Sequence, residues 1–239
     1  MIPSDTLLVI PTYRDSAGLA EFLPGLCAEL ARGGGRVLVQ VVDDGSSAGE
    51  RMWLTNEIDR LRREYSFLQP LQIISRNQGK GHAIRAGWSM APQVSWLAFV
   101  DADGAVPAAE VATLLERVRQ ASDPAMFIAI RTDQPGKTVS RFWYRRLGSR
   151  VFNAWVRLRL TLDLPDTQCG LKVVPASFYR GSTWSEQGFA FDLELLLRAR
   201  ATGLPVITQS VSWNERTGSS LGIGAMLGLF AAVWRLGSQ

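Results

Sequence analysis

Short apolar runs alternate with amphipathic stretches along the first half of the chain. The runs are rich in β-branched and aromatic residues, which is typical of buried strands, and they lie at 7–10, 37–42, 71–74, 96–100 and 126–130. Between them, apolar residues recur at the helical period and predict helices at 17–31, 50–65, 82–90 and 108–120. Strands that alternate with helices form a mostly parallel sheet flanked by helices. The pattern therefore predicts an α/β fold.

The second half of the chain has a different pattern. Residues 137–162 combine arginines with aromatic residues, and a helix there would carry the two kinds of side chain on opposite faces. Such a basic amphipathic helix suits a membrane interface or an acceptor, or it packs on the domain through its aromatic face. Beyond it we expect a strand at 171–174, a helix at 191–201 and a strand at 206–213. We expect one domain over residues 1–220 and an apolar C-terminal segment over 221–239.

Polar motifs follow three of the predicted strands. Residues 11–15, 43–46 and 101–103 come directly after the first, second and fourth strands. In a parallel sheet, ligands bind beyond the carboxyl ends of the strands. We therefore expect the three turns to line one edge of the sheet and to share a ligand.

Asp101-Ala102-Asp103 is the most informative of these turns. Strand alternation places its two carboxylates on the same side, where they repel each other unless a cation lies between them. Mg²⁺ prefers one or two carboxylates together with substrate phosphates. A lone Asp-x-Asp is more often a polar turn, but the two companion turns favour a site for a divalent ion and a diphosphate.

The charge distribution indicates an anionic partner. The chain has 239 residues and a formal net charge of +4, and its basic excess is concentrated between Arg131 and Arg159. Such a cluster faces phosphate, nucleic acid or lipid headgroups, and the carboxylates on the sheet edge argue against nucleic acid. Cys27 and Cys169 are too far apart in sequence to form a metal-spaced pair.

No signal peptide is evident, and no apolar run reaches the roughly 20 residues of a spanning helix. The apolar stretch 221–236 is interrupted by glycines and contains Arg235, so it suits a membrane surface better than a crossing. We expect a cytoplasmic protein that associates peripherally with the inner face of the membrane.

Several motifs resemble those of family 2 glycosyltransferases of the GT-A fold. The segments 9–13, 41–46 and 101–103 resemble motifs that many such enzymes share, whereas 79–85, 166–172, 189–195 and 213–215 resemble the dolichyl-phosphate β-glucosyltransferases. The resemblance extends from about Leu7 to Leu221. It implies a nucleotide-sugar donor, Mg²⁺ or Mn²⁺ as the divalent ion, and a polyprenyl-phosphate acceptor.

The resemblance also assigns roles to individual residues. The nucleotide-sugar site would contain Pro11, Thr12, Tyr13, Asp15, Val42, Asp43, Asp44, Lys80, Asp101 and Ala102. Within this set, Asp44 would accept the imino proton of the base. Asp101 and Asp103 would hold the metal ion, and the catalytic set would be Asp103, Arg131 and Asp192. The acceptor side would contain Gln168, Cys169, Lys172 and Arg216.

Some positions depart from the family pattern or have a structural alternative. Asp15 stands where the family usually has Glu, and Ser220 stands where it often has Lys, which removes a cation near the expected phosphates unless Arg216 substitutes. Lys80 lies at a helix start that favours anions, yet its spacing is not that of a P-loop. Asp192 is equally suited to stabilise a helix N-terminus.

The reaction implied is a metal-dependent, inverting transfer of a sugar, with glucose from UDP-glucose favoured, onto a polyprenyl phosphate at a membrane surface. A transferase of mannose or N-acetylhexosamine, with a lipid-phosphate or glycan acceptor, is the first alternative. A sugar nucleotidyltransferase is a lower one, because the loop after the first strand lacks glycine. The last is a non-enzymatic module that binds an anionic ligand. The oligomeric state is not predicted.

Overall fold

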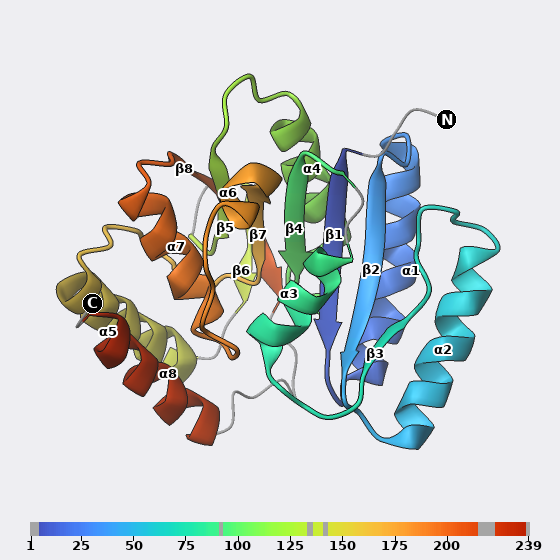
Figure 1. The fold of residues 1–239 in the computed structure, drawn as a ribbon, viewed down its shortest axis with the longest axis horizontal. Coiled ribbons are helices and arrows are strands. Elements are labelled where there is room, and N and C mark those ends of the chain that lie inside the picture. The colour runs from blue at the N-terminus through green and yellow to red at the C-terminus, as the bar shows by residue number, and fades with distance from the viewer. Residues whose placement is uncertain (1–4, 91–92, 133–135, 141–142, 215–222, 238–239) are drawn as a thin grey trace.

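The computed structural model describes residues 5–90, 93–132, 136–140, 143–214 and 223–237. Within them, a seven-stranded sheet has the order β3-β2-β1-β4-β7-β5-β8 (Figure 1). Its strands are β1 (Thr6–Thr12), β2 (Val37–Asp44), β3 (Gln72–Ile74), β4 (Trp96–Val100), β5 (Met126–Ile130), β7 (Leu171–Pro175) and β8 (Val206–Ser210). A small second sheet pairs β6 (Val139–Ser140) with β9 (Trp213–Asn214). The helices are α1 (Ser16–Arg32), α2 (Ala48–Arg62), α3 (Lys80–Ser89), α4 (Ala108–Arg119), α5 (Trp143–Leu160), α6 (Ala176–Arg180), α7 (Phe191–Ala201) and α8 (Ile223–Leu236).

The strand directions confirm the predicted mostly parallel sheet. β1 pairs in parallel with β2 and β4, β2 with β3, and β5 with β8. β7 lies between β4 and β5 and runs antiparallel to both. This reversal places the start of β7 beside the end of β4, where Leu171 is the register partner of Val100. The segment that precedes β7 therefore reaches the edge of the sheet at which Asp101 lies.

Helices cover both faces of the sheet, and each face has its own apolar core. Along β1, Leu8 and Ile10 belong to the core formed with α1, α2 and α4, whereas Leu7 and Val9 belong to the core formed with α3, α5, α7 and α8. None of these four side chains is more than 3% exposed. Burial on both faces explains why the strands are continuous apolar runs rather than alternating ones.

The predicted strand over 206–213 was wrong in one respect, because the chain forms two strands there. The chain leaves the main sheet after β8, where the backbone N–H of Ser212 donates to the Glu110 carboxylate over 3.2 Å. Trp213 then begins β9, and its N–H donates to the Thr138 carbonyl of the small sheet over 2.8 Å. A contact with Glu110, which lies far away in sequence, thus accompanies the break between the two strands, and periodicity does not reveal it.

The basic aromatic segment forms β6 and then α5, which packs against α8 (Figure 1). The ring centroid of Phe230 lies 5.4 Å from that of Phe152 and 5.3 Å from that of Trp155. These aromatic side chains therefore contribute to a helix pair, while Leu158 on the same helix remains 85% exposed. Among the described helices, none is both long enough and apolar enough to cross a bilayer.

Candidate active site at the carboxyl ends of the parallel strands

Asp101 occupies the carboxyl end of β4 and is held from two sides. Its backbone N–H donates to the Gly170 carbonyl over 2.9 Å, and its Oδ1 lies 2.8 Å from Nζ of Lys80. The opposite oxygen, Oδ2, is so close to Gly170 that a Cβ built there would be 1.9 Å away. Only glycine at this position leaves room for the carboxylate. The side chain of Asp101 remains 31% exposed, so one side of it is open to a ligand.

Asp103 lies beyond Asp101, in a turn made possible by Gly104, whose φ is +67°. Its Oδ1 accepts a hydrogen bond from the Ala105 N–H over 2.9 Å. Burial, followed by the negative charge of Asp101, raises the pKa of Asp103. Both effects penalise the ionised carboxylate, and a bound cation would relieve them.

The donor set fits a hard divalent cation that keeps positions open for other ligands. Asp101 and Asp103 supply carboxylate oxygens, which Mg²⁺ and Mn²⁺ accept. In the part of the chain that the structure describes, no group of three or more His, Cys, Asp or Glu side chains could hold a metal ion. Two carboxylates alone suit a metal ion that takes its remaining ligands from a diphosphate.

A buried row of alternating charges extends from Asp101 into the protein. Nζ of Lys80 lies 3.2 Å from Oδ2 of Asp192, and the other oxygen of Asp192 is bonded to Nζ of Lys172. The side chains of Asp192 and Lys172 are 2% and 1% exposed. Burial acts to raise the pKa of Asp192, but Lys172 and Lys80 together hold it below its ordinary value. Asp192 is therefore an ionised carboxylate between two cations.

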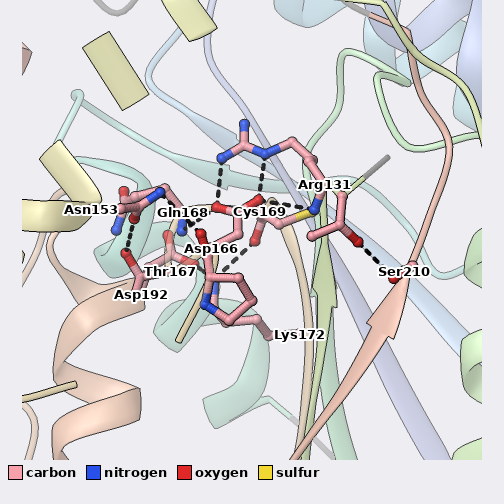
Figure 2. A network of polar contacts seen from close by, with 11 residues as sticks. Arg131, Asn153, Asp166, Thr167, Gln168, Cys169, Lys172, Asp192 and Ser210 are labelled. Carbon is pink, nitrogen blue, oxygen red and sulfur yellow. Dashed lines mark hydrogen bonds and ion pairs between the residues drawn. The ribbon is translucent and has the colours of Figure 1, made fainter. Parts of the chain in front are cut away.

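The aromatic ring of Phe99 packs against both lysines of this charged row. It lies 5.0 Å from Nζ of Lys80 and 5.7 Å from Nζ of Lys172. Lys172 also donates to the Cys169 carbonyl over 2.8 Å, an arrangement visible in Figure 2. Because Lys172 is enclosed, it can influence a ligand only through its partners.

Asp44 shapes the loop that leads into α3. Its carboxylate accepts from the Asn77 side chain over 3.0 Å, from the Gln78 N–H over 3.0 Å and from the Gly79 N–H over 2.7 Å. Burial raises the pKa of Asp44, and the two backbone hydrogen bonds oppose that shift. Asp44, which was predicted to accept the imino proton of a base, thus organises the loop that precedes Lys80.

Asp43 and the turn after β1 form the far part of the same edge. Asp43 is fully buried, accepts from the Ser46 N–H over 3.2 Å, and lies 3.5 Å from Nε of Arg51. The Arg14 N–H donates to Oγ of Ser46 over 3.0 Å, which joins this turn to the turn after β2. Tyr13 is 40% exposed at the surface. Two of the three predicted turns are therefore in direct contact.

Other predicted donor-site residues have clear structural surroundings. Asp15 caps the start of α1, because its Oδ1 accepts from the Gly18 N–H over 3.2 Å, and its charge also acts on Asp103. Thr12 is 4% exposed, and its buried hydroxyl has no hydrogen-bond partner among the described residues. The side chain of Val42 lies in the core against α3. Pro11 and Ala102 complete the predicted set at the ends of β1 and β4.

Arg131 lies at the end of β5 and forms a two-pronged ion pair with Asp166 (Figure 2). The Nε–Oδ2 and Nη2–Oδ1 distances are 2.6 and 2.8 Å. Burial acts to raise the pKa of Asp166, but the charge and hydrogen bonds of Arg131 hold it at about 2. The guanidinium also stacks on the Trp213 ring, 4.6 Å from its centroid. Arg131 thus fixes the segment that precedes β7. Its guanidinium is already engaged by Asp166 and Trp213 within the protein.

The predicted acceptor-side residues lie in that segment. The Gln168 N–H donates to Oδ1 of Asp166 over 3.1 Å, while the side-chain nitrogen of Gln168 is buried with no hydrogen-bond partner in the part of the chain that the structure describes. Cys169 is fully buried, and burial raises the pKa of its thiol to about 12, so the thiol is inert. Arg216 and Ser220 lie outside the described residues.

The structure joins Lys80, Asp101, Asp192 and Lys172 directly, and it reveals partners that the sequence reasoning missed. Phe99, Gly170 and Asp166 are the most important of these. Asp166 and Gly170 lie in the motif 166–172 that carries the family resemblance, which was the available signal. Nothing in the periodicity around Phe99 distinguishes it from an ordinary core residue.

The mostly parallel α/β sheet with the antiparallel β7 inserted in it has the GT-A fold, which solved glycosyltransferase structures share. The chain belongs to glycosyl transferase family 2, whose model matches residues 7–180. Family membership removes the nucleotidyltransferase and the non-enzymatic module from the alternatives.

Two curated relatives are similar to this chain over most of its length. The chain is 29% identical to the polyprenol monophosphomannose synthase of Mycolicibacterium smegmatis over 93% of this chain and 81% of the relative. It is 24% identical to the dolichyl-phosphate β-glucosyltransferase of Saccharomyces cerevisiae over 90% of this chain and 69% of the relative.

Among solved structures, glucosyl-3-phosphoglycerate synthase of Mycobacterium tuberculosis in complex with UDP has a TM-score of 0.66 at 14% identity, with 98% of this chain and 80% of that chain covered. A mannosyltransferase of Pyrobaculum calidifontis in complex with GDP-Man and Mn²⁺ has a TM-score of 0.61 at 14% identity, with 99% and 70% covered. At such identities these structures establish the fold alone.

Proposed function

We propose that this chain is a metal-dependent, inverting glycosyltransferase that transfers glucose from UDP-glucose to a polyprenyl phosphate. The observation that carries the proposal is the carboxylate pair at the end of β4. Burial and the nearby charge of Asp101 raise the pKa of Asp103, and Asp101 is fixed between Lys80 and Gly170. A site with this charge distribution accommodates a divalent ion and the diphosphate of a sugar nucleotide.

The chain's own residues would prepare the donor for departure of its nucleoside diphosphate. Asp101 and Asp103 would hold Mg²⁺ or Mn²⁺, which when bound supplies Lewis-acid neutralisation of the leaving group. Lys80 would add a fixed positive charge beside the diphosphate. The turn after β1, with the exposed ring of Tyr13, would border the nucleoside.

The acceptor requires little acid–base assistance. A polyprenyl phosphate is anionic at neutral pH, so its oxygen can attack the anomeric carbon directly. The new C–O bond forms on the face opposite the leaving diphosphate, and the configuration at that carbon is inverted. Arg131 would act in this step by fixing the segment 166–170 through Asp166 rather than by a direct contact with the phosphate, since its guanidinium is occupied.

The choice of sugar rests on the relatives. The curated relatives include dolichyl-phosphate β-glucosyltransferases from several organisms and a polyprenol monophosphomannose synthase. The motif 166–172 favours glucose, and mannose is the second candidate because the relative of that name is matched at 29% identity over most of both chains. Thermal shift with a panel of sugar nucleotides in Mn²⁺ would decide between them, because a ligand that binds the folded state raises the Tm.

The decisive test combines nucleotide binding with transfer. UDP should bind more tightly with Mn²⁺ than with EDTA, and Asp103→Asn should remove most of that difference. Asp123→Asn is the matched control, because Asp123 is an exposed carboxylate that lines an open hollow of about 360 Å³ away from this edge. Radiolabelled glucose should then pass from UDP-glucose to a polyprenyl phosphate. UDP affinity that is the same in Mn²⁺ and EDTA would refute the metal-dependent part.

Docking at the cytoplasmic face of a membrane is part of the proposal. Leu158 and Val151 on α5 and Trp234 on α8 are 85%, 58% and 63% exposed, and α5 is basic. Leu158→Glu should therefore reduce co-sedimentation with anionic liposomes, because it replaces an apolar contact by a charge that the surface repels. Met52→Glu on α2 is the control, since Met52 is 66% exposed away from this helix pair. Equal sedimentation of both variants and the unaltered protein would contradict docking through α5.

A further inference from the structure

Asp101 already has a cation in contact with its carboxylate. Nζ of Lys80 lies 2.8 Å from Oδ1, and Oδ2 is packed against Gly170. Among the described residues, no lysine or arginine pairs in the same way with Asp103, the other proposed metal ligand. Asp101 is therefore paired with a cation in advance, whereas no described residue gives Asp103 such an ion pair.

Lys80 is held so that it keeps an anionic partner if it releases Asp101. Its Nζ is also 3.2 Å from Asp192, and it lies over the rings of Phe99 and Phe189 at 5.0 and 5.9 Å. Asp192 in turn is fixed by the buried Lys172. The Lys80 side chain is 10% exposed, and it joins the buried Asp192 to the partly exposed Asp101.

A divalent ion that binds Asp101 meets this ammonium at close range. Two cations on one carboxylate repel each other, and repulsion is strong at a site of low exposure. A diphosphate that arrives with the metal ion changes the balance, because it offers the ammonium a new anionic partner in place of Asp101.

We propose that Lys80 is the resident counter-ion of Asp101, and that it makes metal binding dependent on the nucleotide. Without nucleotide, Lys80 competes with the metal ion for Asp101 and metal affinity is low. With nucleotide, the ammonium turns from Asp101 to the diphosphate while Asp192 retains it, and the metal ion takes its place. The inference rests on the proposed function, because it presupposes a donor diphosphate and a metal ion at this edge.

The test is Lys80→Met, with two affinities measured separately. Mn²⁺ binding without nucleotide is followed by electron paramagnetic resonance of the free ion, and UDP binding in saturating Mn²⁺ is followed by calorimetry. We expect Mn²⁺ alone to bind about tenfold more tightly, because its competitor is gone, and UDP to bind at least about tenfold more weakly, because a cation at the diphosphate is gone. The two affinities should change in opposite directions.

Lys80→Arg retains the charge and should keep Mn²⁺ binding weak in the absence of nucleotide. Lys137→Met is the matched control, because Lys137 also pairs with a shielded carboxylate, 2.7 Å from Oε1 of Glu110, outside this site. It should leave both affinities unchanged. Should Lys80→Met melt at a lower temperature than the unaltered protein, Lys80→Gln, which keeps a polar end at Asp101, is measured in its place.

Mn²⁺ binding without nucleotide that is unchanged or weaker in the folded variant would overturn the inference. A lysine with only a structural role predicts that result, because loosening of the loop lowers both affinities together. Failure of the proposed function would look different: the unaltered protein itself would then bind no UDP with Mn²⁺ present.

Discussion

Replacing Gly170 with alanine should disable the candidate site while the fold stays intact. A Cβ at this position would lie 1.9 Å from Oδ2, 2.3 Å from Cγ and 3.0 Å from Cβ of Asp101. Distances below 3.0 Å cannot persist, so the Asp101 side chain must rotate away. That rotation would break the 2.8 Å contact with Lys80 and remove one of the two carboxylates from the metal site.

The expected effect on stability is small because two contributions nearly cancel. Moving Asp101 off its preferred rotamer costs ~0.5–1.5 kcal/mol. Gly170 does not have a left-handed φ, and replacing glycine by alanine at such a position contributes about 0.4–1 kcal/mol through the unfolded state. The free energy of unfolding should therefore change by less than about 1 kcal/mol. The affinity for UDP in Mn²⁺ should fall by about 10–100-fold, the usual consequence of disturbing a residue that positions a metal ligand.

Calorimetric titration of UDP in Mn²⁺ and urea unfolding of the protein without ligand would measure the two quantities. Gly188→Ala is the matched control, because its Cβ would meet nothing within 4 Å, and both quantities should stay unchanged. The reasoning is refuted if Gly170→Ala retains the affinity of the unaltered protein. It is also refuted if the affinity falls only together with a large loss of stability.

Three further outcomes follow from the buried charges. Arg131→Met should lower the free energy of unfolding by about 3–5 kcal/mol, because it leaves Asp166 buried without its partner. Asp166→Asn should cost less in urea titration, because the amide oxygen can still accept a hydrogen bond from the guanidinium. The pKa of Asp166 is lowered from 3.8 to about 2. The stability that its ionised form contributes is therefore complete above pH ~4 and is lost as the pH falls toward 2. Acid unfolding of Asp166→Asn should lack that loss. Asp44→Ala should lower the Tm and weaken UDP binding in thermal-shift assays, because the N–H groups of Gln78 and Gly79 lose their acceptor, at about 1–3 kcal/mol for an unsatisfied buried group.

Most of the sheet could be predicted because strand and helix periods are local properties. The strands at 7–10, 37–42, 96–100 and 126–130 all exist, although β1 and β2 extend to Thr12 and Asp44 and so include the first two residues of each predicted turn. The direction of β7 could not be predicted, because an antiparallel strand inserted between two others depends on which neighbours it meets, not on its own apolar run. That insertion is what brings Gly170 to Asp101.

The residues of the candidate site could be predicted from the sequence, but most of their contacts with one another could not. Asp101, Asp103, Lys80 and Asp192 were all selected in advance, yet the contact between Lys80 and Asp192 joins residues 112 positions apart. Asp44 was expected to contact a base, and the structure turns it toward its own loop. Arg131, which was predicted as a catalytic residue, is paired with Asp166, because a buried ionised group is stable only with an opposite charge beside it.

The sequence by itself determined the order of most strands and helices along the chain, the family, and the residue types at one edge of the sheet, because periodicity and motifs depend on neighbouring residues. The tertiary structure alone decided how the charges are paired. Electrostatic attraction depends on distance in space and on burial, and neither is set until β7 and α7 pack beside β4. Asp101 therefore faces Lys80 and Gly170 only in the folded chain, and its readiness for a cation is a property of that packing.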